Sequence, residues 1–245
     1  MKQKIILSSI IAASFFLTAC GSSGNDGNKN GNGGGNHGNK GNGGVDVNSY
    51  PTYSLTQQNK NDLAFMGNEE RLAYNVYMNL YNYHNNNGNE IKQLYNISSG
   101  SEVKHIETVR DLVNKYNIKP EDLTVLDSAP VASSTTDQSD LPDDKYGVAH
   151  IQTLYNDLMA KGESSVQDAL EVGCMIEVTD INDLNPKIQN AIDSGAKDLE
   201  DAFSFLRDGS YNHYWAFDKG LKNLGIDDGC CSLGDEWCHN EYPKK

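Results

Sequence analysis

Apolar residues recur at every third or fourth position through most of the chain, from about residue 53 to residue 225. Stretches that alternate apolar with polar residues, as a half-buried strand would, are few over the same range. A spacing of three and four places the apolar side chains on one face of an α-helix. The sequence therefore predicts an all-α fold in which helices bury their apolar faces against one another.

Turn and breaker residues divide this range into four long helices and one extra short helix. The long helices are predicted over residues 56–83, 90–116, 166–184 and 196–224, and the short one over residues 145–160. Asn185-Pro186 marks a boundary after the third long helix, although a Pro in the first turn could also restart a helix. Residues 119–144 are rich in Ser, Thr, Asp and Pro, so we expect a crossover along the surface. One long crossover is what an up-down-down-up four-helix bundle requires.

The first 20 residues have the features of an export signal. Lys2 and Lys4 precede an apolar run from Ile5 to Leu17, which is too short to span a bilayer. Leu17-Thr18-Ala19-Cys20 then resembles the bacterial lipobox, in which the Cys is lipidated and becomes the new N-terminus. The alternative is an ordinary cleaved signal with an incidental Cys. We predict a signal peptide over residues 1–19 and a lipid on Cys20, with the membrane as partner.

The segment that follows is a linker by composition. Between residues 21 and 44, 18 of 24 positions are Gly or Asn and none is aliphatic or aromatic, so the segment cannot bury a core. We divide the chain into a lipidated linker (20–48), a helical domain (49–226) and a Cys-containing tail (227–245). Gly21 after the Cys resembles the outer-membrane sorting pattern of two-membrane bacteria. The expected location is the cell envelope, at the periplasmic face of the outer membrane or at the cell surface.

The charge balance excludes one class of partner. The chain has 34 Asp and Glu against 20 Lys and Arg, a net charge of −14, and its basic residues form no dense patch. Coating nucleic acid requires clustered Lys and Arg to neutralise phosphates. We therefore expect no nucleic-acid partner, and protein partners are not readable from the sequence.

Ionisable residues interrupt the apolar face of each long helix. Such residues are seldom buried in a bundle unless they are paired or bound to metal. They are Glu69 and Glu70 on the first helix, Glu102 and His105 on the second, Glu177 and Asp180 on the third, and His213 on the fourth.

Spacing decides how these residues face the interior. Glu102 and His105 lie three residues apart, which places a carboxylate and an imidazole side by side on one helical turn. At 100° per residue, Glu69 falls near the centre of the apolar face of its helix and Glu70 near its edge.

Four blocks of sequence together resemble a known family. They are Glu69-Glu70-Arg71-Leu72-Ala73-Tyr74-Asn75-Val76-Tyr77, Ser101-Glu102-x-x-His105, Ala169-Leu170-x-x-Gly173-x-x-Ile176-Glu177-x-x-Asp180, and Gly209-Ser210-x-Asn212-His213-x-x-Ala216-Phe217. The pattern resembles the bacterial domain-of-unknown-function family 2202, placed in the ferritin-like superfamily of di-metal carboxylate bundles. The resemblance implies two iron or manganese ions between the helices. Matching positions imply the ligands Glu70, Glu102, His105, Glu177 and His213, with Glu70 ranked ahead of Glu69.

Ser210 departs from the superfamily pattern, which has a second Glu-x-x-His at this place. The loss of one ligand leaves a single-metal site open, and Asp180 could supply the missing charge. The competing interpretation is a buried polar network in which His105 and His213 bond to the acids without metal. Two His and at least four acids on four facing helices favour metal.

The cysteines after Cys20 are disulfide candidates, as is usual in an exported chain. They are Cys174, Cys230, Cys231 and Cys238. Cys238 could close a short tail loop with Cys230 or Cys231, and Cys174 could face the metal site. A metal site formed by the three tail cysteines and His239 is the weaker alternative.

The leading functional hypothesis is a membrane-anchored, metal-dependent protein that performs redox chemistry with oxygen or peroxide, as iron and manganese sites with open positions do. In this hypothesis Glu102 or Glu177 bridges the metals, and His105 and His213 are terminal ligands. Tyr77 is expected mainly to pack, with a redox or hydrogen-bonding role near the metals as the alternative. Two alternatives share the bundle: metal storage without turnover, and a non-enzymatic surface lipoprotein that serves as a binding or scaffold module.

Overall fold

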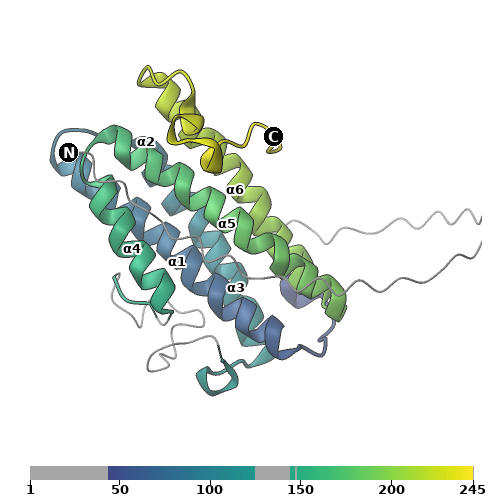
Figure 1. Ribbon diagram of the computed structural model, residues 1–245. Coiled ribbons are helices and arrows are strands. Elements are labelled where there is room, and N and C mark those ends of the chain that lie inside the picture. Colours follow the sequence, from purple (N-terminus) through teal and green to yellow (C-terminus); the bar gives the residue numbers. More distant parts are fainter. Residues whose placement is uncertain (1–43, 125–143, 147, 245) are drawn as a thin grey trace, which may run out of the picture. The chain divides into compact units, whose positions relative to one another are not determined.

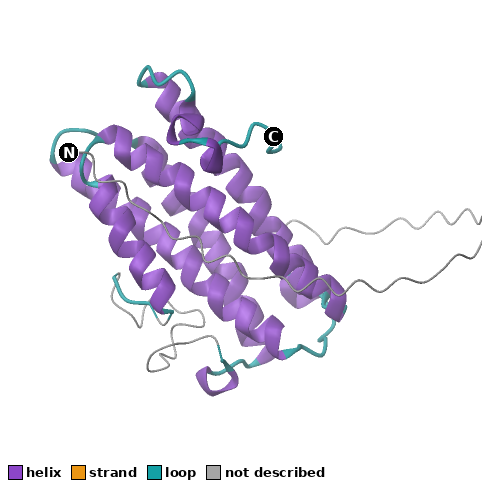
Figure 2. Ribbon diagram, viewed as in Figure 1, coloured by secondary structure: helices purple, strands orange, loops and turns teal. Residues whose placement is uncertain are grey.

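The computed structural model describes residues 44–124, 144–146 and 148–244. Within these ranges the chain forms helices and loops and contains no strand, which confirms the all-α prediction (Figure 2). The predicted signal peptide, Cys20, most of the linker and most of the crossover lie outside the described residues. In the described part, no helix is both long and apolar enough to cross a membrane.

The first long helix, α1 (Gln57–Asn86), begins at a reciprocal cap. The Thr56 hydroxyl accepts a hydrogen bond from the Asn59 amide, and the Asn59 side chain accepts one from the Thr56 amide. From Asp62 to Tyr77 every residue of α1 is buried except Phe65 and Tyr74. The helix is thus covered on most sides of its middle section, not on one face alone.

The predicted helix over residues 90–116 is interrupted. It consists of α2 (Lys92–Ile97), a π-helical turn (Ser98–Glu102) and α3 (Val103–Tyr116). The turn has the sequence Ser-Ser-Gly-Ser-Glu, whose small residues are weak helix formers. The Ser98 hydroxyl donates to the Tyr74 carbonyl and the Ser99 hydroxyl to the Tyr95 carbonyl, so these side chains bond to backbone instead of packing.

The third long helix, α5 (Val166–Ser194), begins after a Ser165 cap and continues through Pro186. The predicted boundary at Asn185-Pro186 is therefore wrong. Pro186 has no amide hydrogen and removes one backbone bond. Burial of Leu184, Ile188 and Ala191 on the same helix keeps the segment helical across that defect. The helix ends at Gly195, whose φ of 71° is the left-handed conformation that glycine adopts readily.

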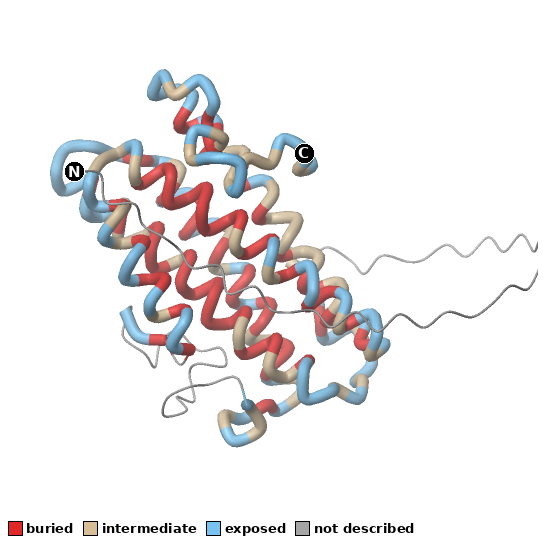
Figure 3. The backbone as a smooth tube through the Cα atoms, viewed as in Figure 1, coloured by how far each residue is buried: buried red, intermediate tan, exposed pale blue. Residues whose placement is uncertain are grey.

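The remaining helices are α4 (Ala149–Gly162), which is the extra short helix, and α6 (Lys197–Asn223). Figure 1 shows α5 and α6 side by side and antiparallel, joined by the turn at Gly195, and α1 also packs against α3, α4 and α5. Buried residues line the inner faces of these helices (Figure 3). Gly173 lets α5 approach α6 closely, because a Cβ there would lie 2.3 Å from the Phe217 ring.

One part of the interior is purely apolar. This apolar core includes Leu63 and Met66 of α1, Val109 and Leu112 of α3, Leu184 and Ile188 of α5, and Leu199, Phe203 and Leu206 of α6.

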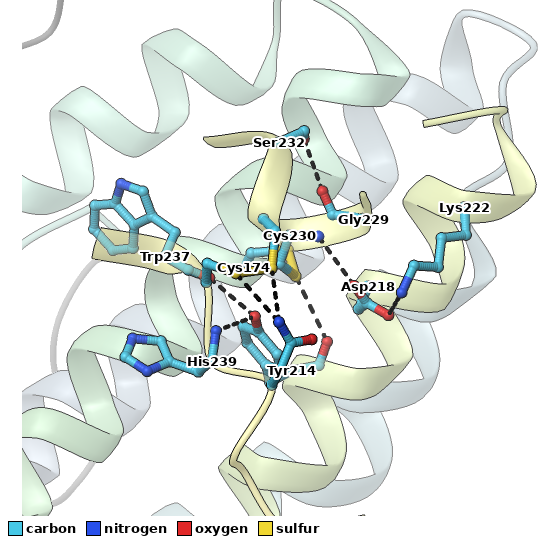
Figure 4. Close-up of polar contacts among 12 residues, drawn as sticks. Cys174, Tyr214, Asp218, Lys222, Gly229, Cys230, Ser232, Trp237 and His239 are labelled. Carbon is cyan, nitrogen blue, oxygen red and sulfur yellow. Dashed lines mark hydrogen bonds and ion pairs between the residues drawn. A yellow bond between two sulfur atoms is a disulfide. The ribbon is translucent and has the colours of Figure 1, made fainter. Parts of the chain in front are cut away.

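The tail is fixed to α5 and α6 (Figure 4). Disulfides join Cys174 to Cys230 and Cys231 to Cys238. The Cys230 amide donates to Asp218, and the Tyr214 hydroxyl donates to the Trp237 carbonyl while accepting from the His239 amide. Since these cysteines are bonded to one another, the alternative metal site with His239 does not form.

Candidate metal centre

Five side chains meet between the helices, one each from α1, the π-helical turn, α3, α5 and α6. Each is at most 6% exposed. They form two groups whose ligand atoms lie within 4.8 Å of one another, and we call these the first triad and the second triad. The first triad is Glu70, Glu102 and His105, and the second is Glu102, Glu177 and His213. Together the five residues form the candidate metal centre.

In the first triad a single imidazole nitrogen faces two carboxylates. His105 Nδ1 lies 3.0 Å from Glu70 Oε2 and 3.2 Å from Glu102 Oε2. Glu70 Oε1 is buried and has no hydrogen-bond partner. One oxygen of this carboxylate is therefore engaged and the other is open.

The second triad repeats this arrangement. His213 Nδ1 lies 3.0 Å from Glu102 Oε1 and 3.4 Å from Glu177 Oε2, but it is aligned with neither for a hydrogen bond. The Tyr77 hydroxyl, completely buried, donates to Glu177 Oε1 at 2.5 Å. Tyr77 therefore makes a hydrogen bond as well as packing, with its ring 5.2 Å from that of Phe217.

Glu102 belongs to both triads through different oxygens. Its Oε2 faces His105 and its Oε1 faces His213, and the two imidazole rings lie 5.6 Å apart. Each oxygen of the Glu102 carboxylate thus faces a different imidazole, so Glu102 could contribute one oxygen to each of two neighbouring metal ions. Glu102 is the last residue of the π-helical turn, a feature that often occurs at functional sites.

Burial and mutual charge shift the pKa values of these groups strongly. Burial raises the pKa of Glu70 to about 7, even though His105 opposes the shift. Burial lowers the pKa of His213, but the carboxylates of Glu177 and Glu102 outweigh it and raise the value to about 10. Burial would likewise raise the pKa of Glu102, yet His213 and His105 hold it below its ordinary range. In the protein alone, protonated imidazoles thus balance the buried carboxylates.

The structure decides between the two adjacent glutamates of α1. Glu70 reaches His105, whereas Glu69 lies outside both triads. Helical-face geometry favours Glu69, but that geometry assumes one buried face, and α1 is buried on most sides of its middle section. Glu69 is 3% exposed, and burial together with Asp183 and Asp180 raises its pKa well above the ordinary value.

Asp180 and Ser210 also face the interior without joining a triad. The Ser210 hydroxyl donates to Asp180 Oδ2, and Asp180 Oδ1 is buried without a partner. Ser210, three residues before His213, thus contacts Asp180, the acid expected to add charge near it.

Gly209, the first residue of the fourth sequence block, also belongs to the site. A Cβ at this position would lie 2.4 Å from His105 Nε2. Glycine in the middle of a helix lowers helix stability, so its presence at the centre of α6 is the signal that could have indicated a close neighbour.

The fold and the site define an all-α protein with two buried Glu/His triads that could hold metal ions. The chain belongs to the family described as "Uncharacterized protein domain (DUF2202)", whose model matches residues 59–236. The family resemblance predicted from the four sequence blocks is thereby confirmed.

Two comparisons point to the same relative. The chain is 34% identical over 179 residues to the uncharacterized protein MJ0754 of Methanocaldococcus jannaschii, covering 73% of this chain and 83% of the relative. It is also similar to the crystal structure of the hypothetical protein MJ0754 from Methanococcus jannaschii, with a TM-score of 0.57 and 30% identity. That alignment covers 72% of this chain and 86% of the other.

Proposed function

We propose that the protein is a ferritin-like redox protein that holds two iron or manganese ions in its candidate metal centre and reacts with oxygen or peroxide. The observation that carries this proposal is the shared carboxylate of Glu102, which faces His105 with one oxygen and His213 with the other. Carboxylate and imidazole donors suit iron and manganese.

Unsatisfied buried atoms support the fit of metal to this site. Glu70 Oε1 and His213 Nδ1 have no hydrogen-bond partner. Among the described residues, the only side chains within ion-pair distance of the triad carboxylates are the two histidines themselves. A purely structural polar network would be expected to satisfy its buried atoms more completely.

The helix arrangement supports the ferritin-like part of the proposal. The helix α1 and the α2–α3 segment are neighbours joined by a short loop, and α5 and α6 are antiparallel neighbours. A long connection between the two pairs is the expected feature of such a bundle. Ser210 leaves α6 with one ligand, His213, so the proposed site is asymmetric.

In the proposed mechanism Glu70, Glu102 and His105 would hold one ion, and Glu102, Glu177 and His213 would hold the other. When bound, the two ions supply electron transfer and open positions for the oxidant. The chain's own residues position the ligands: the Tyr77 hydroxyl holds its proton against Glu177 Oε1, and Gly209 leaves room for the His105 ring. Tyr77 and Phe217 keep water from that side, because both are fully buried.

Metal loading tests the proposal. Purified protein from residue 21 onward, without the predicted signal peptide and Cys20, is loaded anaerobically with Fe(II), and bound metal per chain is measured for the wild type, His105→Ala and Glu177→Ala. We expect two equivalents for the wild type and a clear loss in both variants. Glu171→Ala is the control, because Glu171 is a buried glutamate of the same helix that pairs with Lys161 away from the centre. A wild type that binds no more metal than the variants would overturn the proposal.

Oxidation of the loaded protein separates catalysis from storage. Rapid, repeated Fe(II) oxidation under oxygen or peroxide is the result expected for turnover. Oxidation once per site, with the metal retained, would indicate metal storage instead.

The proposal includes a lipid anchor on Cys20 and a location in the cell envelope. The supporting observations are Leu17-Thr18-Ala19-Cys20 and the Gly/Asn-rich linker that follows it. The expected result is that the full chain, expressed in a bacterium, fractionates with membranes and that Cys20→Ala releases it. Membrane association that survives this substitution would contradict the anchor.

A further inference from the structure

Three acidic residues form a line along one face of α5. Asp183, Asp180 and Glu177 are spaced three residues apart, so each step advances about 4.5 Å along the helix. The side chain of Asp183 is 35% exposed, whereas Asp180 and Glu177 are only 5% and 2% exposed. The line thus runs from the protein surface to a member of the second triad.

A surface pocket opens at the outer end of this line. Its volume is about 360 Å³, and its walls include Asp62 and Phe65 of α1 and Asp183 and Lys187 of α5. Asp62 is already held on both oxygens, by Gln58 and Asn190. The other carboxylate of the pocket is that of Asp183, which Lys187 contacts at Oδ1.

Two further carboxylates lie between the pocket and the triads. Glu69 Oε2 and Asp180 Oδ1 are both buried without hydrogen-bond partners. On α5 the acids step from Asp183 in the pocket wall through Asp180 to Glu177 of the second triad, and on α1 Glu69 directly precedes Glu70 of the first triad.

The positively charged side chain of Lys187 lies at the outer end of this line. The Lys187 ammonium donates to the Asp183 carbonyl at 3.0 Å and lies 3.4 Å from Asp183 Oδ1 and 4.2 Å from the Phe65 ring centre. Lys187 is only 7% exposed, so its charge is held in the pocket wall. The outer part of the line therefore accommodates a positive charge beside Asp183.

We propose that Asp183, Glu69 and Asp180 form the path by which a divalent cation passes from this pocket to the candidate metal centre. The inference rests on the proposed function, since it concerns access to the same centre. Successive carboxylates replace the water lost by the cation as it enters the interior. Glu69 and Asp180 act as transient ligands, because neither belongs to a triad. Lys187 occupies the mouth and opposes the cation by its own charge.

Loading kinetics test the path separately from the site. Co(II) is mixed with the metal-free protein in a stopped-flow instrument and followed by its absorbance, and the final number of bound ions is measured in parallel. The variants are Asp183→Asn, Glu69→Gln and Lys187→Met. Glu200→Gln is the matched control, because Glu200 is a 29% exposed acid that pairs with a lysine elsewhere, on α6.

We expect Asp183→Asn to load about fivefold more slowly and Lys187→Met to load faster, both with the wild-type number of ions. Glu69→Gln should also load slowly to the full number, and Glu200→Gln should match the wild type. Equal loading rates for Asp183→Asn and the wild type, at full occupancy, would overturn the path alone. A lower final number in Glu69→Gln would make Glu69 a resident ligand and contradict its transient role. A wild type that binds no Co(II) or Fe(II) would overturn both the path and the proposed function.

Discussion

The apolar core and the candidate metal centre are built on the same helices but have opposite chemistry. On α6, Phe203 and Leu206 belong to the apolar core, whereas Ser210 and His213, one and two turns further on, face carboxylates. On α3 the order is reversed, with His105 followed by Val109 and Leu112. The apolar core stabilises the fold because it removes apolar side chains from water. The candidate metal centre opposes folding, because burying its charged groups costs desolvation free energy. The difference implies that the first region carries stability and the second carries function.

The largest expected effect is in the apolar core. Phe203→Ala removes a fully buried ring and should lower the free energy of unfolding by about 3–5 kcal/mol, measured by urea denaturation. Metal bound per folded chain should not change, because Phe203 lies in the apolar core and belongs to neither triad. Leu224→Ala is the control, since Leu224 is 49% exposed and should change stability by less than about 0.5 kcal/mol. A loss of metal without a loss of stability would break the comparison.

The two disulfides differ in the length of chain that each one closes and therefore in their expected effect on stability. Cys174–Cys230 closes a separation of 56 residues one turn from Glu177, whereas Cys231–Cys238 closes a separation of 7 within the tail. Loop-closure entropy predicts losses of about 4 and about 2 kcal/mol when each pair is replaced by alanine. Thermal and urea unfolding of the two double variants would check this order, and a larger loss from the tail pair would contradict it.

The pH dependence of the metal-free protein should come from the metal centre. His213 has a pKa of about 10 in the folded protein against an ordinary value of 6.5, so its contribution is complete below pH 6.5 and is lost as the pH rises through 10. The pKa of Glu70, raised by burial to about 7, makes stability fall between pH 4.5 and 7. Both shifts have the same sign. Unfolding free energy measured from pH 5 to 10 should therefore decrease, on the order of a few kcal/mol, and bound metal should reduce the slope. A flat profile would contradict the charge balance described above.

The smallest expected change in unfolding free energy is that of Glu70→Gln, which should raise stability while it lowers metal binding. At pH 8, Glu70→Gln removes a carboxylate that the fold prefers to protonate, so the metal-free protein should gain about 1–2 kcal/mol while losing metal. Glu171→Gln is the control, and it should have the opposite pair of effects. It removes a carboxylate that Lys161 contacts at 2.5 Å, so stability should fall and metal binding should persist. Chemical denaturation with and without Mn(II) checks both outcomes, and a Glu70→Gln variant that is destabilised would contradict the trade-off.

Local sequence signals predicted the all-α fold and most helix limits. The Thr56 cap, the Ser165 cap and Gly225 after α6 each act within a few residues, so a single sequence contains the information. The π-helical turn and the passage of α5 through Pro186 depend instead on packing against other helices. They could not be predicted from spacing alone.

The candidate site was predictable to a similar extent. The Glu102–His105 spacing and the interruptions at Glu177 and His213 indicated which side chains face inward, and the structure brings these four together with Glu70. Helical-face geometry favoured Glu69 over Glu70, because it takes no account of the burial of α1 on most sides. The pairing of Cys174 with Cys230 joins residues that only the folded chain brings together.

The central claim is that Glu102 is shared between two bound ions. A crystal structure of the protein grown with Mn(II), with anomalous differences recorded at the manganese absorption edge, tests it most directly. The account predicts two anomalous peaks on either side of the Glu102 carboxylate, one beside His105 and the other beside His213. A single peak that does not involve Glu102, or no peak between the helices, would contradict it.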